Sequence, residues 1–228
     1  MCGRFAVFSK ADDYLAALDA GDVLMGCDAV ENYNAYPTQH LPVLYRDTDA
    51  VLRYAKLHWG LIPSWSKDTS IAFKLSNARS ETADQKPSFR HAFKQQRCVI
   101  PVDGWYEWKR DGKNKQPYYH HNIDNQMIGL AGLWESWVSK ETGEFIRSFT
   151  ILTQEATGKA QAIHHRMPVF INPKQANAWL DNQLHDKEAI TGIMDYQIDD
   201  AIEIYPVSKN MNSPKNEGSK CIEKLLVS

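Results

Sequence analysis

The sequence predicts an α+β fold, a single compact domain in which helices flank a strand-rich, barrel-like sheet of mixed or antiparallel strands. The 228 residues suffice for one domain rather than two. Runs rich in β-branched and aromatic residues recur through the middle of the chain, and turn signals separate them at short intervals between Asp47 and Gly143. Helical patterns do not alternate regularly with these runs, as a parallel doubly wound sheet would require.

Each element is justified by its local composition. Alternating, β-branched and aromatic patterns predict strands over residues 4–8, 41–46, 51–58, 98–102, 105–110, 118–121, 127–134 and 149–153. The Asp111-Gly112 pair predicts a hairpin turn. Helices are expected over residues 10–18 and 88–94, and after Asn172-Pro173, which supplies an N-cap followed by proline at the first helical position.

Composition excludes several classes of protein. With 43% hydrophobic and 24% charged residues the chain is neither disordered nor fibrous. No apolar run approaches the ~18 to 20 residues of a membrane span, and the first residues lack the apolar core of a signal peptide. We therefore expect a cytoplasmic, nucleoid-associated protein with no membrane partner. The formal charge of −2 gives no overall attraction to a polyanion, so any basic surface must be local.

Four cysteines are spaced far apart, at Cys2, Cys27, Cys98 and Cys221, with no Cys-x-x-Cys pair. This spacing argues against a zinc ribbon or a redox dithiol, and we expect reduced thiols with no metal or other cofactor. Cys27 and Cys98 sit among apolar or small residues and are expected to fill the core.

Cys2 differs from the other cysteines because it follows Met1 directly. Removal of the methionine would leave an α-amine and a thiol on adjacent carbons. The amine, with a reference pKa of about 7.7 to 8.0, condenses with an aldehyde, and the thiol then closes on the imine to give a thiazolidine ring. The alternative is that cysteine occupies the second position by chance.

Glu107 lies among aromatic residues in a predicted strand. Alternation places it on one strand face with Trp105, whereas Tyr106 and Trp108 take the other face. An apolar environment raises the pKa of a carboxyl group and makes it usable as a general acid or base near neutral pH. The alternative is a solvated glutamate paired with a lysine across the hairpin.

His164, His165 and Arg166 lie between a predicted helix and an extended segment that ends at Pro168. Histidine is a natural proton shuttle, and a guanidinium group can bind a phosphate through two hydrogen bonds. Adjacent histidines in an extended segment point to opposite faces, which disfavours metal binding. A structural role for both histidines stays open.

Residues 86–115 hold eight basic and three acidic side chains, a local excess of five positive charges. Aromatic and polar residues in and near this stretch could form a groove for single-stranded nucleic acid: Trp59, Trp65, Asn77, Arg79, Trp105 and Trp108. The alternative is a solvated surface. Asn34, in a segment that ends at Pro37, is expected in a rigid turn that holds its amide toward a ligand or merely forms the turn.

Six segments in order resemble the motifs of the SOS-response-associated peptidase (SRAP) family. They are Met-Cys-Gly-Arg-Phe at 1–5, Tyr-Asn at 33–34, Trp-Gly-Leu-Ile-Pro-Ser-Trp at 59–65, Asn-Ala-Arg-Ser-Glu-Thr at 77–82, Gly-Trp-Tyr-Glu-Trp-Lys at 104–109 and His-His-Arg-Met-Pro at 164–168. The resemblance implies one domain over residues 1–228, with motifs at 2–208 and a C-terminal tail at about 210–228. The sequence has His165 where the family more often has aspartate, so His164 is chosen by register.

The resemblance implies an abasic-site-processing protein, which binds single-stranded DNA and links its N-terminal cysteine covalently to the lesion. By motif position, Cys2 is the nucleophile, Glu107 assists proton transfers, His164 acts at the sugar hydroxyl and the leaving phosphate, and Asn34 holds the reacting centre. The DNA-binding residues implied are Arg4, Trp65, Asn77, Arg79, Trp108 and Arg166, with Trp65 as the ring that stacks at a strand junction.

Further expectations from the resemblance concern activity and partners. Reversal of the crosslink, cleavage of the DNA strand at the lesion and self-removal of Met1 are implied activities. The implied partners are abasic single-stranded DNA and replication-fork junctions, bound by a monomer. Two alternatives stay open: an N-terminal-nucleophile glutamine amidohydrolase, which glutamine turnover would reveal, and a non-covalent single-strand binder, which would give no adduct on a denaturing gel.

Overall fold

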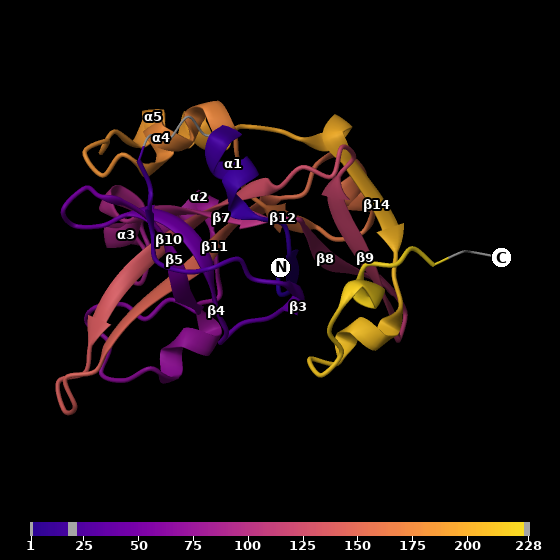
Figure 1. Cartoon of the computed structure of the whole chain (residues 1–228), viewed down its shortest axis with the longest axis horizontal. Helices are drawn as coiled ribbons and strands as arrows, with labels where there is room; N and C mark the ends of the chain where they lie inside the picture. Colours follow the sequence, from indigo (N-terminus) through magenta and orange to yellow (C-terminus); the bar gives the residue numbers. More distant parts are fainter. Residues whose placement is uncertain (1, 18–21, 226–228) are drawn as a thin grey trace.

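A five-stranded barrel forms the centre of the protein in the computed structural model, which describes residues 2–17 and 22–225 (Figure 1). Its strands are β4 (His40–Arg46), β5 (Leu52–Trp59), β7 (Arg97–Val102), β10 (Ile128–Val138) and β11 (Phe145–Glu155). Neighbours pair in the order β5-β4-β7-β10-β11, all antiparallel, and a parallel contact between β11 and β5 closes the ring. This closure confirms the barrel-like sheet that the sequence predicts.

Short strands extend the barrel at its margins. β2 (Leu24–Met25) pairs with β5, β13 (Phe170–Ile171) pairs with β10, and β6 (Asn77–Arg79) and β12 (Arg166–Pro168) both pair with β11. Because β6 and β12 lie along the same strand, residues 77–79 and 166–168 are brought together at one end of the barrel.

A second, antiparallel sheet lies beside the barrel, on the side away from the projecting β10–β11 hairpin (Figure 1). Its order is β14 (Ile202–Pro206), β9 (Asn114–Asn122), β8 (Gly104–Asp111), β1 (Phe5–Val7) and β3 (Asn32–Ala35). At Gly104 a Cβ atom would lie 2.4 Å from the carbonyl oxygen of His120, so only glycine permits β8 and β9 to approach this closely.

Helices flank the two sheets, as expected for an α+β fold. They are α1 (Ala11–Ala17), α2 (Ser80–Ala83), α3 (Arg90–Gln95), α4 (Ala176–Leu180) and α5 (Lys187–Met194). Short 3₁₀ turns are η1 (Ser70–Lys74), η2 (Gly158–Ala162), η3 (Pro173–Gln175), η4 (Asp199–Ala201), η5 (Lys209–Asn212) and η6 (Ser219–Cys221). None of the described helices is long and apolar enough to cross a membrane.

The predicted elements are present, and several are longer than the sequence indicates. All eight predicted strands exist, with β9, β10 and β11 extending beyond their predicted limits. The Asn172 side chain accepts a hydrogen bond from the Lys174 backbone N–H, which confirms the predicted N-cap. The predicted helix over 10–18 corresponds to α1, and Leu18 lies outside the described residues.

Expectations about four single residues are wrong. Trp59 and Trp105 were expected to line a groove for nucleic acid, but both are buried in the hydrophobic core. Asn34 was expected in a turn but lies in β3, because residues 32–35 pair with β1 through Phe5 and Ala35. Arg97 belongs to the basic stretch expected to form a groove but is 2% exposed. Its guanidinium donates to the carbonyl oxygens of Phe93, Lys94, Trp179, Asp181 and Leu184 at the ends of α3 and α4. Burial lowers the Arg97 pKa to about 10, and the side chain acts as a cap for these helices.

The buried His120 ring should make the free energy of unfolding depend on pH. It is fully buried against Trp105, and burial lowers its pKa to about 3. In the unfolded chain its pKa is about 6.5, so its contribution to stability is complete above that pH and is lost as the pH falls toward 3. Urea unfolding between pH 7 and 4 should therefore show a loss of up to about 1.4 kcal/mol per pH unit that His120→Phe removes.

The matched control is His185→Phe, which replaces an exposed histidine. This variant should keep the pH dependence of the wild type. If the free energy of unfolding of His120→Phe falls between pH 7 and 4 as steeply as that of the wild type, the result would contradict the buried, neutral state of the His120 ring.

Candidate active site

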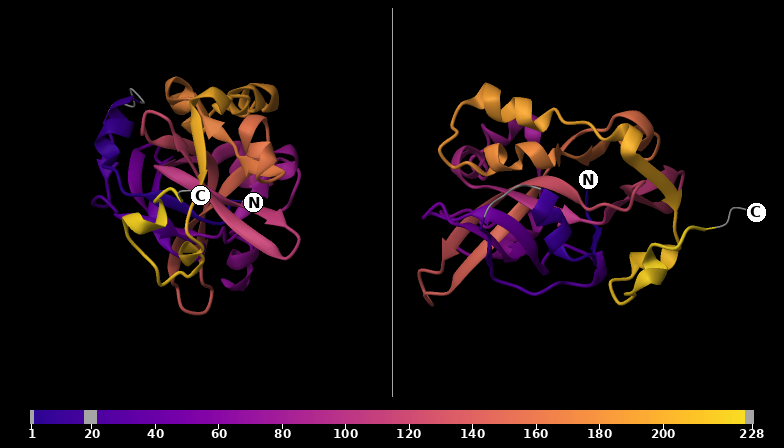
Figure 2. Two further views of the ribbon diagram at one scale, coloured as in Figure 1. Left: turned by 90° about the vertical axis from the view of Figure 1, so that its right-hand side faces the viewer. Right: turned by 45° about the horizontal axis from the view of Figure 1, so that its top comes forward.

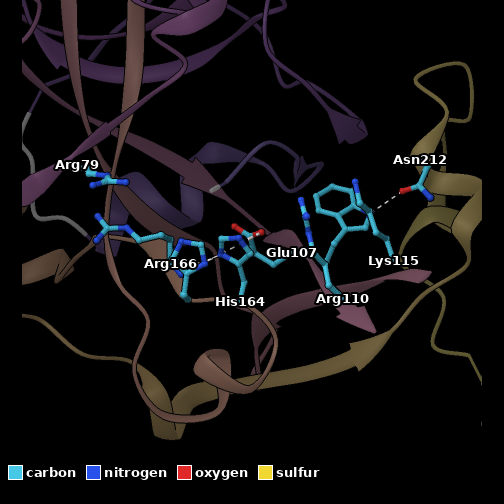
Figure 3. Close-up of a pocket in the computed structure, with 9 residues that line it drawn as sticks. Arg79, Glu107, Arg110, Lys115, His164, Arg166 and Asn212 are labelled. Carbon is cyan, nitrogen blue, oxygen red and sulfur yellow. Dashed lines mark hydrogen bonds and ion pairs between the residues drawn. The ribbon is translucent and has the colours of Figure 1, made fainter. Parts of the chain in front are cut away.

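A cleft of about 640 Å³ opens where the end of the barrel meets β8 (Figure 3). It is lined by Arg79, Glu107, Trp108, Arg110, Lys115, His164, His165, Arg166 and Asn212. Four of these side chains are arginine or lysine, whereas Glu107 is the one carboxylate among the lining residues. In Figure 3 Arg79 and Arg166 lie to one side of Glu107 and His164, and Arg110 and Lys115 lie to the other.

The short length of β1 explains why both faces of β8 reach this cleft. β1 pairs with the first half of β8, with Phe5 opposite Trp105 and the Tyr106 N–H donating to the Arg4 carbonyl oxygen at 3.0 Å. β8 continues to Asp111, beyond the described partners on β1. Glu107 and Trp108 therefore both border the open space, although they point to opposite faces of the strand.

Cys2 precedes β1 and is fully buried beside this part of β8. Its carbonyl oxygen accepts a hydrogen bond of 2.9 Å from Asn77 Nδ2, and its thiol lies 4.0 Å from the Arg4 carbonyl oxygen. Burial raises the pKa of the thiol, and the negative charge of Glu107 raises it further. The thiol is thus held neutral next to a carboxyl group.

Glu107 and His164 lie next to each other in the cleft. His164 Nδ1 lies 3.9 Å from Glu107 Oε2 and 3.0 Å from both the backbone nitrogen and the carbonyl oxygen of Arg166. Burial raises the pKa of Glu107 and lowers that of His164. The two pKa values therefore move toward each other, which suits proton exchange near neutral pH.

His165 occupies a different environment from His164. Its side chain is exposed at the cleft, and its ring centroid lies 4.4 Å from that of His164. The charge of His164 lowers the pKa of His165. Of the two histidines, only His164 is half-buried beside Glu107.

Arg166 is already bound to another side chain, whereas Arg79 is exposed. The Arg166 guanidinium makes two hydrogen bonds to the Glu81 carboxylate, at 2.6 and 2.9 Å, and one to the Thr153 carbonyl oxygen at 2.5 Å. The hydrogen bonds from Arg166 lower the pKa of the Glu81 carboxyl group. Much of the Arg166 charge is thus neutralised, and Arg79 presents its charge to the cleft.

The sequence of this chain matches a known protein family. The family model described as SOS response associated peptidase (SRAP) matches residues 1–214. This chain belongs to the SRAP family. It is 37% identical to the abasic site processing protein YoqW of Bacillus subtilis, over 98% of this chain and 99% of the relative. It is 30% identical to the abasic site processing protein YedK of Escherichia coli, with the same coverage.

A solved structure shares the SRAP fold of this chain. A crystal structure of a protein from Bacteroides thetaiotaomicron matches with a TM-score of 0.83 and 26% identity. The match covers 99% of this chain and 100% of that chain.

The SRAP motif residues differ in where they lie relative to the cleft. Arg79, Glu107, Trp108, His164 and Arg166 line the cleft. Cys2 and Asn77 lie directly behind it, joined by their hydrogen bond. Trp65 lies apart, 59% exposed in the loop that follows β5.

Arg4 and Asn34 do not line the cleft themselves but bind the C-terminal segment of the chain, which includes the lining residue Asn212. Asn34 Oδ1 accepts from Arg4 Nη1 at 2.6 Å. Asn34 Nδ2 donates to the carbonyl oxygens of Met211, Ser213 and Asn216, at 2.9 to 3.1 Å. The two residues therefore fix residues 211–216 next to the site.

Among the residues that line the cleft, Asn212 is the one that sequence reasoning missed. Arg110 and Lys115 were predicted only as part of the basic stretch 86–115, and His165 only as the neighbour of His164. Strand alternation places Arg110 on the same face as Trp108, and Lys115 lies opposite Arg110 in the β8–β9 register. Asn212 had no local signal. Among the described residues, no group of three or more His, Cys, Asp or Glu side chains is placed to hold a metal ion.

Glu107→Gln should make the Cys2 thiol more acidic, because the substitution removes the negative charge that adds to the effect of burial. Alkylation of Cys2 by iodoacetamide, followed by peptide mass spectrometry, should become about 3- to 10-fold faster at pH 8.

The control is Glu135→Gln, which replaces another buried carboxyl group. Glu135 lies on β10 and is paired with His91 of α3. This variant should leave Cys2 alkylation unchanged. Equal rates in wild type and Glu107→Gln would show that the two groups are not coupled.

Proposed function

We propose that this SRAP protein processes abasic sites in single-stranded DNA by forming a thiazolidine between Cys2 and the ring-opened sugar. The observation that carries the proposal is the burial of Cys2 beside Glu107, at a cleft that also holds His164 and is flanked by cations on both sides. The relatives YoqW and YedK, both abasic site processing proteins, support the same substrate.

The proposed reaction requires a free α-amine on Cys2, and hence removal of Met1, which lies outside the described residues. The amine nitrogen attacks the C1′ aldehyde carbon to give a carbinolamine. Loss of water then gives an imine. The Cys2 sulfur adds to the same carbon while its proton moves to the nitrogen, and the ring closes. One water leaves in total, and no oxidant or reductant is needed.

Glu107 and His164 supply the proton transfers. Glu107, with its raised pKa, donates a proton to the departing hydroxyl group and accepts the thiol proton during ring closure. His164, with its lowered pKa, is neutral near pH 7 and can accept a proton from a sugar hydroxyl group. The reverse of these steps would reopen the ring, so the same pair supports reversal of the crosslink.

The arrangement of charges suits one DNA strand. Arg79 on one side of the reacting centre, and Arg110 and Lys115 on the other, can contact phosphates on both sides of the lesion (Figure 3). Trp108 offers a ring for stacking with a neighbouring base, which requires that base to be unpaired. Exposed Trp65 is proposed to stack at the junction between single and double strands.

Substitution of Cys2 tests the covalent step. Wild type incubated with single-stranded DNA carrying one abasic site should give a heat-stable adduct by mass spectrometry, with the mass of both components minus one water. Cys2→Ala should give none, because it lacks the thiol. Cys2→Ser keeps the amine and can form an imine, but its weaker oxygen nucleophile should not hold a ring.

Cys27→Ala is the matched control, since Cys27 is a free, half-buried cysteine outside the cleft lining. It should crosslink like the wild type. A stable adduct from Cys2→Ala would refute the thiazolidine, and non-covalent binding without any adduct would identify a binding module instead.

Arg79→Ala tests the path of the DNA. Binding of single-stranded DNA should weaken with salt, and loss of one phosphate contact should make the log-log slope less steep by about 0.7. Fluorescence anisotropy between 50 and 300 mM salt would measure both slopes.

The control is Arg90→Ala, an exposed arginine on α3 that is not among the residues lining the cleft. It should preserve the wild-type slope. Equal slopes for Arg79→Ala and wild type would remove Arg79 from the DNA path.

A further inference from the structure

Residues 207–225, which we name the C-terminal wall, follow β14 and lie beside the second sheet (Figure 2), and Asn212 within them lines the cleft. Gln116 Nε2 donates to the Val207 carbonyl oxygen at 2.8 Å, and Lys209 Nζ donates to Asn114 Oδ1 at 2.6 Å. Asn34 and Arg4 hold the wall from the opposite side, through the carbonyl oxygens of residues 211–216. The wall is therefore anchored to two strands of the second sheet.

One side chain of this wall enters the cleft. Asn212 Oδ1 accepts a hydrogen bond of 2.8 Å from the indole Nε1–H of Trp108. The Asn212 carbonyl oxygen also accepts from Arg4 Nη2 at 3.2 Å, which fixes the backbone at this point. In Figure 3 the labelled Asn212 reaches from the wall toward the cleft, and the dashed line marks its bond.

This hydrogen bond uses the polar edge of the indole. The flat face of the ring is left as the surface that Trp108 can offer to a ligand. A ring held in one orientation loses less conformational entropy on stacking with a base than a ring that turns freely. Base–aromatic stacking tolerates any base, so such a ring contributes affinity rather than sequence preference.

We infer that Asn212 is a positioning residue that sets the orientation of Trp108, and that the C-terminal wall thereby controls how tightly the cleft holds the nucleotide beside the lesion. The inference rests on the proposed function for the identity of the ligand. It assigns no proton transfer to Asn212, which acts through Trp108. Loss of Asn212 should therefore weaken DNA binding and leave the rate of crosslinking at saturating DNA unchanged.

The test separates binding from chemistry. Single-stranded DNA with a tetrahydrofuran in place of the abasic sugar has no aldehyde, so its Kd measures binding alone. Asn212→Ala should raise this Kd about 3- to 10-fold, the effect of losing one hydrogen bond of ordinary strength. The adduct rate with true abasic DNA at saturation should stay within about twofold of wild type.

A double-mutant cycle tests whether Asn212 acts through Trp108. Trp108→Phe keeps an aromatic face but removes the Nε1–H. If the two residues act together, Asn212→Ala should weaken binding no further in the Trp108→Phe background. Additive losses would overturn the inference.

Asn210→Ala is the matched control on the same 3₁₀ turn, η5, because the described bonds of Asn210 are made by its backbone. It should bind the tetrahydrofuran DNA like the wild type. A loss equal to that of Asn212→Ala would show general loosening of the wall and would overturn the specific role.

A measurement without DNA keeps the inference separate from the proposed function. The indole N–H signal of Trp108 in a ¹H–¹⁵N spectrum, assigned by its absence in Trp108→Phe, should move upfield in Asn212→Ala and stay in place in Asn210→Ala. An unmoved signal in Asn212→Ala would refute the hydrogen bond. If wild type binds DNA but forms no adduct, the proposed function fails, and the Kd and spectral comparisons still decide the role of Asn212.

Discussion

Strand β1 lies between β8 and β3, and the site depends on its backbone pairing with β8. The pairing sets Phe5 opposite Trp105 and thereby places Cys2 alongside Glu107. Because β1 ends its contact there, the rest of β8 stays open on that side and presents residues from both of its faces. A shift of one residue in this register would turn the strand by a full face and separate the thiol from the carboxyl group.

The electrostatics of the site follow from burial more than from charge. Burial raises the pKa of both Cys2 and Glu107 and lowers that of His164, so it acts against the charged form of each group. The arginines of the chain differ in how much of their charge a ligand could reach. Arg166 is bound to Glu81 and Arg97 is enclosed under two helices, whereas Arg79 faces the open space. A count of basic residues along the sequence therefore overstates the positive charge available to a ligand.

The sequence predicted those parts of the site that have a local pattern. Strand alternation placed Glu107 among aromatic rings, and the position of Cys2 after Met1 suggested its chemistry. The contacts of Asn34 and Asn212 have no such pattern, because their partners lie 177 and 104 positions away in the sequence. Arg97 was misjudged for the same reason, since the carbonyl groups that it caps come from residues up to 87 positions away.

The contact between Arg4 and the Met211 carbonyl oxygen joins residues that are 207 positions apart. During synthesis the N-terminal residues leave the ribosome first, and the segment that completes their surroundings emerges almost last. Such long-range pairing is also slow to form once the chain is complete. The cleft beside Cys2 is thus completed only at the end of translation, so a nascent chain carries its N-terminal residues without the C-terminal segment that borders them in the folded protein.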